Sequence, residues 1–115
     1  MPSISSRRFC RWSWPSFIPQ ALRDLARAIE IDPHNAAAFY NRGTIYGGLG
    51  EDRKALADFN RAVEINPRHA RAYHNRGVAH LRLGSERQAI EDIKRAAGLG
   101  YDEARRFLSS RGLDW

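Results

Sequence analysis

The chain has 115 residues, the length of a single domain, and 43% of them are hydrophobic, which is enough for one core. Its one cysteine, Cys10, excludes an internal disulfide framework and a metal site built from several cysteines, so we expect a cytoplasmic protein. The formal net charge is +6, and residues 1–20 supply half of it through Arg7, Arg8 and Arg11 without any acidic residue. The remaining surface mixes both signs, and this argues only weakly for a nucleic-acid partner.

Residues 1–19, MPSISSRRFCRWSWPSFIP, contain Pro15 and Pro19, and proline interrupts a helix. We predict an irregular or disordered leader here, or the remnant of a longer array. The arginine- and serine-rich, acid-free composition is also typical of a targeting segment, although the apolar stretch of a secretory signal is absent. A third interpretation is that aromatic side chains of the leader cover the following helix. These side chains are Phe9, Trp12, Trp14 and Phe17.

Residues 20–35 repeat a later segment: ALRDLARAIEIDP at 21–33 matches ALADFNRAVEINP at 55–67 at eight of thirteen positions. We therefore predict a half repeat, the second helix of a helix pair without its first. Such a helix leaves an apolar side without a neighbour, so self-association with a second copy of the chain is an alternative function. That side consists of Leu22, Leu25 and Ile29.

The next two segments form an internal repeat of 34 residues. AFYNRG at 38–43 returns as AYHNRG at 72–77, and residues 36–69 align with 70–103 at twelve identical positions. Apolar residues recur at spacings of one, three and four, so each unit, 36–69 and 70–101, is predicted to form two helices. In the first unit these residues are Phe39, Gly43, Tyr46 and Leu49, then Ala55, Leu56, Phe59, Ala62 and Val63.

Turn signals separate the predicted helices. Gly50 and Gly84 are expected to end the first helix of each unit in the left-handed conformation, and SERQ at 85–88 is expected to form a capping box. Asn66 and Pro67 close the first unit, because proline cannot continue a helix.

Residues 102–115 are predicted to form a C-terminal capping helix and tail, with Asp102 as the N-cap and Gly112 as the stop. Arg111 falls where the first helix of another unit would need glycine. We therefore expect the close-packed array to end at this helix.

Side chains of the repeat suggest how the helices pack. Small residues such as Gly43 and Ala62 are expected to let the two helices of a unit approach closely. Arg42 and Arg76 recur at one register, so we expect a structural role in which the stem covers apolar surface and the charged head lies in water. The acidic residues are expected on outer faces, where they serve solubility; they are Asp52, Asp58, Glu64, Glu86 and Asp92.

This pattern resembles the tetratricopeptide repeat (TPR) family, in which helix A carries an aromatic residue, leucine, glycine and tyrosine, and helix B carries alanine, phenylalanine and a closing proline. The matching residues are Phe39, Gly43, Tyr46, Ala55, Phe59, Ala62 and Pro67, then Tyr73, Gly77, Ala89, Ile93 and Ala96. The departures are Arg42 and Arg76 for leucine, His80 for tyrosine, expected as a hydrogen-bonded core residue, and Tyr101 for the closing proline. The resemblance covers residues 21–101. It implies an all-α fold, a right-handed α-solenoid of antiparallel helix pairs with about two and a half TPR units and a C-terminal capping helix.

In TPR proteins the A helices line a concave groove that holds a peptide, so the resemblance implies a non-catalytic protein-protein interaction module. The groove positions carried onto this sequence are Ala37, Tyr40, Asn41, Thr44, Gly47 and Gly48, then Arg71, His74, Asn75, Val78, Leu81 and Arg82. We take as the candidate site Tyr40, Asn41, Thr44, Arg71, His74, Asn75, Val78 and Arg82. Their polar to basic character predicts a protein or peptide partner of acidic character, with plain solvated helix surface as the alternative. Asn41 and Arg71 resemble fragments of the carboxylate clamp that grips chaperone tails. Tyr40, Thr44 and Asn75 replace other residues of that clamp, so we do not predict it.

No motif for catalysis stands in the sequence: neither a glycine-rich phosphate loop, nor a nucleophile elbow, nor a zinc-binding histidine pair. We therefore expect no enzyme activity, no cofactor and no metal site. Weak nucleic-acid binding through Arg7, Arg8 and Arg11 with the nearby tryptophans remains an alternative function.

Overall fold

The computed structural model describes residues 18–115, and these residues form helices joined by short turns. Residues 18–31 are helical, and five labelled helices follow: α2 (Ala36–Gly48), α3 (Asp52–Ile65), α4 (Ala70–Arg82), α5 (Glu86–Gly98) and α6 (Asp102–Ser110). The interpretations of the leader, and the nucleic-acid alternative that depends on Arg7, Arg8 and Arg11, lie outside the described residues.

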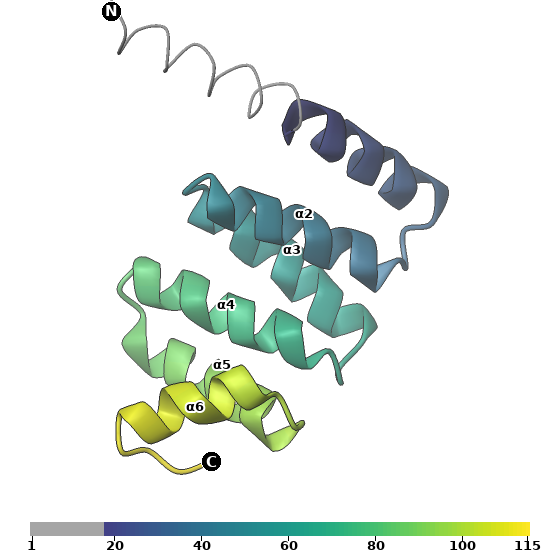
Figure 1. Cartoon of the computed structure of the whole chain (residues 1–115). Helices are drawn as coiled ribbons and strands as arrows, with labels where there is room; N and C mark the ends of the chain where they lie inside the picture. The colour runs from purple at the N-terminus through teal and green to yellow at the C-terminus, as the bar shows by residue number, and fades with distance from the viewer. Residues whose placement is uncertain (1–17) are drawn as a thin grey trace, which may run out of the picture.

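The helices pack in successive pairs along the molecule (Figure 1). α2 packs against α3 and α4 against α5, while α3 contacts α4 and α6 covers α5. No strand interrupts residues 18–115. This arrangement confirms the prediction of an all-α fold built from antiparallel helix pairs. No helix in the described part of the chain is long and apolar enough to cross a membrane.

Pro19 is the second of the helical residues 18–31 and so lies in the first described turn, where proline is tolerated. The expectation that it interrupts a helix concerns the residues before it, which lie outside the described residues. The fixed φ of proline is itself helical, and its ring disturbs only the turn that precedes it, so a helix can continue after it. The apolar side of this helix does contact the next pair, since Ile29 packs against the core cluster that contains Phe39 and Val63.

Glycine ends the helices as predicted. Gly50 and Gly84 have φ of 81° and 83°, and Gly112 has 69°, in the left-handed region where side chains are strained. Gly100 plays the same part after α5, with φ of 99°. Asn66 has the extended backbone that a residue before proline prefers.

Two predictions of helix starts are wrong. Ser85 is the N-cap of α5, but its side chain makes no capping hydrogen bond, so the capping box does not form. Tyr101, not Asp102, is the N-cap of α6, because the extended backbone that an N-cap needs occurs at Tyr101. Asp102 instead begins the helix, where its charge favours the positive end of the helix dipole.

Close approach of paired helices depends on one glycine in each unit. A Cβ atom at Gly43 would lie 2.9 Å from Cε1 of Phe59, and one at Gly77 would lie 2.8 Å from Cγ1 of Ile93. Both distances are too short for packed atoms, so neither position can carry a side chain without displacing its neighbour. The main-chain oxygen of Ala89 would lie 2.9 Å from the atom added at Gly77, and Ala89 itself is fully buried.

Arg42 and Arg76 have the structural role that was expected, but their charged heads bind carboxylates instead of lying in water. The prediction that Asp58 and Asp92 lie on outer faces is wrong. Asp58 and Asp92 are buried, with 4% and 3% of their surface exposed. The Nε and Nη2 groups of Arg42 donate to Asp58 at 2.8 and 2.7 Å, and Arg76 binds Asp92 at the same distances. A buried carboxylate requires a charged partner, and the antiparallel pair brings each arginine opposite the residue sixteen positions later.

Candidate functional site: the surface between α2 and α4

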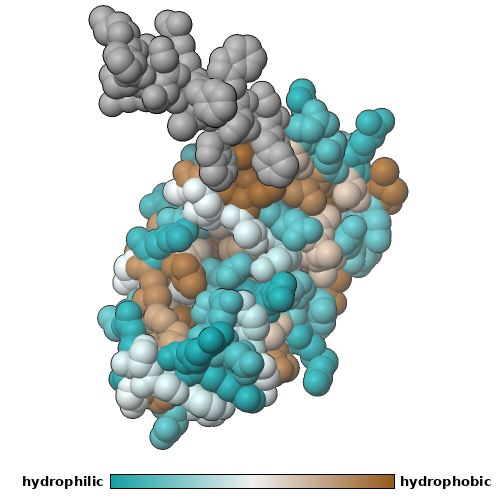
Figure 2. All heavy atoms as spheres, viewed as in Figure 1, coloured by the Kyte–Doolittle hydropathy of each residue, from teal (hydrophilic) through white to brown (hydrophobic). Residues whose placement is uncertain are grey.

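The first helices of the two complete pairs, α2 and α4, contact one another (Figure 1). Residues Tyr40, Asn41 and Thr44 lie on α2, and the other five predicted site residues lie on α4. The 34-residue register places all eight on these neighbouring helices, because each set occupies the same stretch of its own unit. Polar side chains cover most of the molecular face seen in Figure 2, with smaller apolar patches between them.

A hydrogen-bonded bridge joins three of the predicted residues across the two helices. Nδ2 of Asn75 donates to the hydroxyl oxygen of Tyr40 at 3.2 Å and to Oγ1 of Thr44 at 3.5 Å. The Thr44 hydroxyl in turn donates to the main-chain oxygen of Tyr40 at 2.9 Å. The bridge holds the amide group of Asn75 in one orientation, in which its carbonyl oxygen is left to accept another hydrogen bond.

A hollow of about 250 Å³ lies beside this bridge. Four predicted site residues line it together with the two glycines at the end of α2 and two apolar core residues. The lining is Thr44, Gly47, Gly48, Phe59, Asn75, Val78, Ala79 and Arg82.

Arg82 stands at the rim of the hollow, and its charge is partly compensated. Its Nη1 group donates to the main-chain oxygen of Gly47 at 2.9 Å and lies 3.4 Å from Oδ1 of Asp52. Half of the Arg82 side chain remains exposed. Arg71, at the other end of α4, is exposed as well, and so is Asn41 on α2.

His74 lies apart from the hollow and faces α6. Its ring packs edge-on against Tyr101, with 5.1 Å between ring centroids, and its buried Nδ1 atom has no hydrogen-bond partner among residues 18–115. Burial lowers the pKa of His74 below the ordinary 6.5, and the carboxylate of Glu103 opposes this only in part. His74 is therefore mainly neutral at pH 7 and adds little positive charge to the surface.

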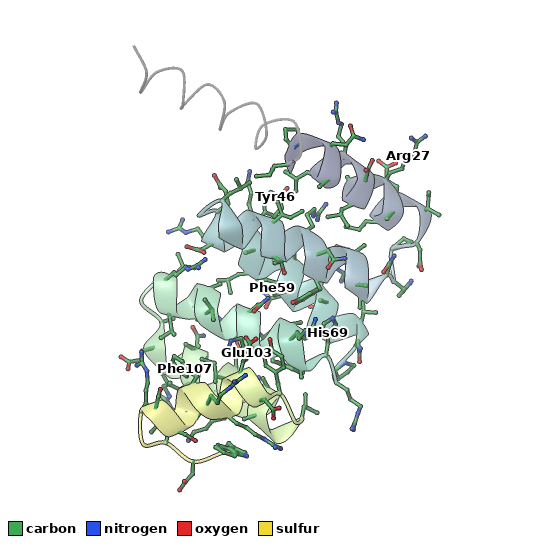
Figure 3. The ribbon with its side chains drawn as sticks, in the orientation of Figure 1. Arg27, Tyr46, Phe59, His69, Glu103 and Phe107 are labelled. Carbon is green, nitrogen blue, oxygen red and sulfur yellow. The ribbon has the colours of Figure 1, made fainter. Side chains whose placement is uncertain are left out.

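Sequence analysis missed Tyr101 and Glu103 as residues of this surface. Glu103 lies where α6 meets α4 (Figure 3), and burial and the Glu103 carboxylate together raise the pKa of Tyr101 above its usual 10.0. The available signal was the register, since α6 begins 66 residues after the start of α2, within two residues of two repeat periods, and so occupies the place of the first helix of a third unit. The sequence by itself predicts only a capping role for α6.

Another stacked pair borders the surface at the start of α4. The ring centroids of Tyr40 and His69 lie 4.8 Å apart, and those of Tyr40 and Phe59 lie 6.1 Å apart. Figure 3 shows Phe59 and His69 in the region between the two helix pairs. Tyr40 is thus half-buried, packed against His69 and Phe59 and hydrogen-bonded to Asn75.

Comparison with protein families gives three matches that overlap along the chain. Tetratricopeptide repeat models match residues 36–69 and 59–91, and a TPR repeat model matches residues 18–50. A search of curated proteins by sequence found no match.

Solved structures with the same fold include MamA, with 30% identity, a TM-score of 0.66, and coverage of 73% of this chain and 49% of that one. YrrB, described as a TPR protein with an unusual peptide-binding site, has 28% identity and a TM-score of 0.67, over 74% of this chain and 44% of YrrB. The first TPR domain of Spaghetti (RPAP3), bound to the HSP90 peptide SRMEEVD, has a TM-score of 0.72 with 22% identity, over 90% and 89% of the two chains. That likeness concerns the fold alone. The chain spans about half the length of the MamA chain.

Proposed function

The chain belongs to the tetratricopeptide repeat family, and on that premise we propose that it is a protein-interaction module that binds a peptide segment of a partner along α2 and α4. It acts as an adaptor without chemistry of its own. YrrB, whose structure resembles 74% of this chain, is described as having a peptide-binding site, and this supports the proposal.

The observation that carries the proposal is the hollow between α2 and α4 with hydrogen-bonding groups at its edge. A peptide main chain offers one N–H and one C=O for each residue, and these groups must be matched when it binds. The carbonyl oxygen of Asn75 and the exposed amide of Asn41 supply an acceptor and a donor for them.

Charge favours a partner segment with some acidic residues. Arg71 and Arg82 are exposed cations on α4, and guanidinium groups bind carboxylates with paired hydrogen bonds. Glu103 and Asp52 lie on the same surface and lower its positive charge. The proposed partner is therefore moderately acidic, and a run of many acidic residues would meet repulsion at Glu103.

A displayed library of random peptides, selected on the full chain, tests the proposal. We expect selected peptides to bind Arg71→Glu at least about tenfold more weakly than the parent, because one charge-assisted contact is lost and a repulsive one replaces it. Arg87→Glu is the matched control, since that side chain is 93% exposed on α5, outside the proposed groove. Failure to select any peptide, or equal loss of binding in both variants, would contradict the proposed function.

A further inference from the structure

Two glycines at the end of α2 have no packing reason, in contrast to Gly43. A Cβ atom at Gly47 would meet its nearest neighbours at 3.8 and 3.9 Å, which is ordinary contact, and one at Gly48 would meet nothing within 4 Å. The left-handed residue that ends this helix is Gly50, two positions later. Glycine destabilises a helix relative to alanine, so Gly47 and Gly48 weaken α2 without any requirement of the fold.

What the two glycines do create is the hollow between α2 and α4. In the second unit the same positions are Leu81 and Arg82: Leu81 packs against the core cluster around Ile93, and Arg82 reaches back to the oxygen of Gly47. The hollow's volume of about 250 Å³ lies below the roughly 300 to 1,000 Å³ of small-molecule sites. It suits one side chain of a bound peptide better than a whole ligand.

The walls of the hollow decide which kind of side chain fits. Phe59, Val78 and Ala79 present apolar surface, and the polar groups of Thr44 and Asn75 stand at the side where the bridge lies. A charged side chain placed between the apolar walls would lose its hydration without a partner. An aliphatic side chain would bury apolar area there, which is favourable.

Arg82 indicates which type of peptide residue lies next to that side chain. Its Nη1 group is held by Gly47 and Asp52, while its Nε and Nη2 groups donate to no other described residue. These two groups together form the fork that binds a carboxylate. The rim of the hollow therefore favours an acidic residue beside the apolar one.

We propose that Gly47 and Gly48 form a subsite for one aliphatic side chain of a bound peptide, with an adjacent acidic residue held by Arg82. The absence of side chains at both glycines lets the peptide main chain approach α2 closely, and the oriented carbonyl oxygen of Asn75 accepts one of its N–H groups. This inference rests on the proposed function and adds the chemistry of the bound segment to it.

Peptides selected on the parent chain supply the probe. We expect them to share an aliphatic residue next to an aspartate or glutamate, and replacing that aliphatic residue by alanine should weaken binding about tenfold or more. Gly48→Leu should fill the hollow, so that the peptides selected on the parent chain bind this variant more weakly, to a similar extent. Gly98→Leu is the matched control, because Gly98 is also the last residue of its helix, meets nothing within 4 Å and lines a different hollow.

A double-mutant cycle separates a real contact from an indirect effect. In Gly48→Leu the alanine replacement in the peptide should no longer change Kd, because the pocket it addresses is already filled. Selected peptides that the Arg71→Glu variant no longer binds, but whose binding to the parent does not depend on an aliphatic residue, would overturn the subsite. The proposed function would then still stand. A parent chain that selects no peptide would overturn both. The peptide replacement is measured on the unaltered chain, so the result does not depend on the folding of a variant.

Discussion

Glycines of α2 illustrate how one residue type serves two purposes within a single helix. Gly43 faces Phe59 and Asp58, and an added Cβ would lie 2.9 to 3.1 Å from their side-chain atoms. Gly48 faces open space. Packing therefore requires the first glycine, whereas an added Cβ at the second meets no neighbour.

Alanine at these two positions should change stability in opposite directions. Gly43→Ala is expected to lower the free energy of unfolding by about 1 to 3 kcal/mol, because the methyl group overpacks the contact with Phe59. Gly48→Ala is expected to raise it by about 0.5 to 1 kcal/mol, because alanine favours the helix and meets no neighbour. Urea unfolding of both variants measures the two changes. A loss of stability in Gly48→Ala would show that this glycine has a structural role, and would remove the first argument for the subsite.

Helix starts differ between the two repeat units in a way that depends on pH. α2 begins after Asn35, whose amide oxygen accepts a hydrogen bond from the N–H of Ala38 at 3.1 Å. α4 begins after His69, whose Nδ1 accepts from the N–H of Ala72 at 3.2 Å. Only an imidazole without a proton on Nδ1 can accept this bond, so protonation removes the cap and places a positive charge at the positive end of the helix dipole.

Acidification should therefore destabilise the chain through His69. Burial lowers the pKa of His69 below 6.5, so the unfolded chain takes up this proton at a higher pH than the folded chain. The contribution of neutral His69 to the free energy of unfolding is complete above about pH 6.5 and is lost as the pH falls below that value. Burial of His74 acts in the same direction.

Thermal unfolding of His69→Asn between pH 7.5 and pH 5 tests this expectation. Asparagine supplies the uncharged cap that α2 already has, so the variant should lose less stability on acidification than the parent. The reciprocal variant, Asn35→His, should lose more. Identical pH profiles for the parent and His69→Asn would show that the cap does not control the start of α4.

The molecule as a whole is a row of helices in which each contacts its near neighbours along the chain. Polar side chains link the two complete units: Asn75 reaches Tyr40, and Nη1 of Arg76 donates to Asn60 at 3.1 Å. α6 adds two fully buried residues, Ala104 and Leu108, against α5. Helical residues 18–31 have no fully buried side chain, in contrast to the five buried residues of α3. Stability in such a row is the sum of units and interfaces, so a helix without buried side chains contributes less to it.

Hydrogen exchange of backbone amides should reveal this gradient. We expect amides of residues 18–31 to exchange about tenfold or more faster than those of α3, because local opening of this helix exposes few buried contacts. Equal protection of both helices would contradict the expectation and show that a further surface covers residues 18–31. Repeating the measurement at lower protein concentration would then tell whether a second copy of the chain provides that surface.

The sequence by itself determined the all-α fold, the helix pairs and the helix ends at Gly50 and Gly84. These features follow from periodicity and from the conformational freedom of glycine, which are local properties of the chain. It also assigned the eight candidate site residues to two helices that prove to be neighbours, because residues at one register of a repeat share one face. Their role as a binding groove stays a prediction.

Only the tertiary structure decided which charges meet. Arg42 and Asp58 both recur in the second unit, sixteen residues apart each time, and that double recurrence was the signal available for their ion pair. The compensation of Arg82 by Asp52, the neutral His74 beside Tyr101 and the hollow at Gly48 carried no comparable signal. Periodicity determines which faces of the helices pack. The burial, charge and free space at a side chain depend on what lies opposite it, and this is settled only when the helices are in contact.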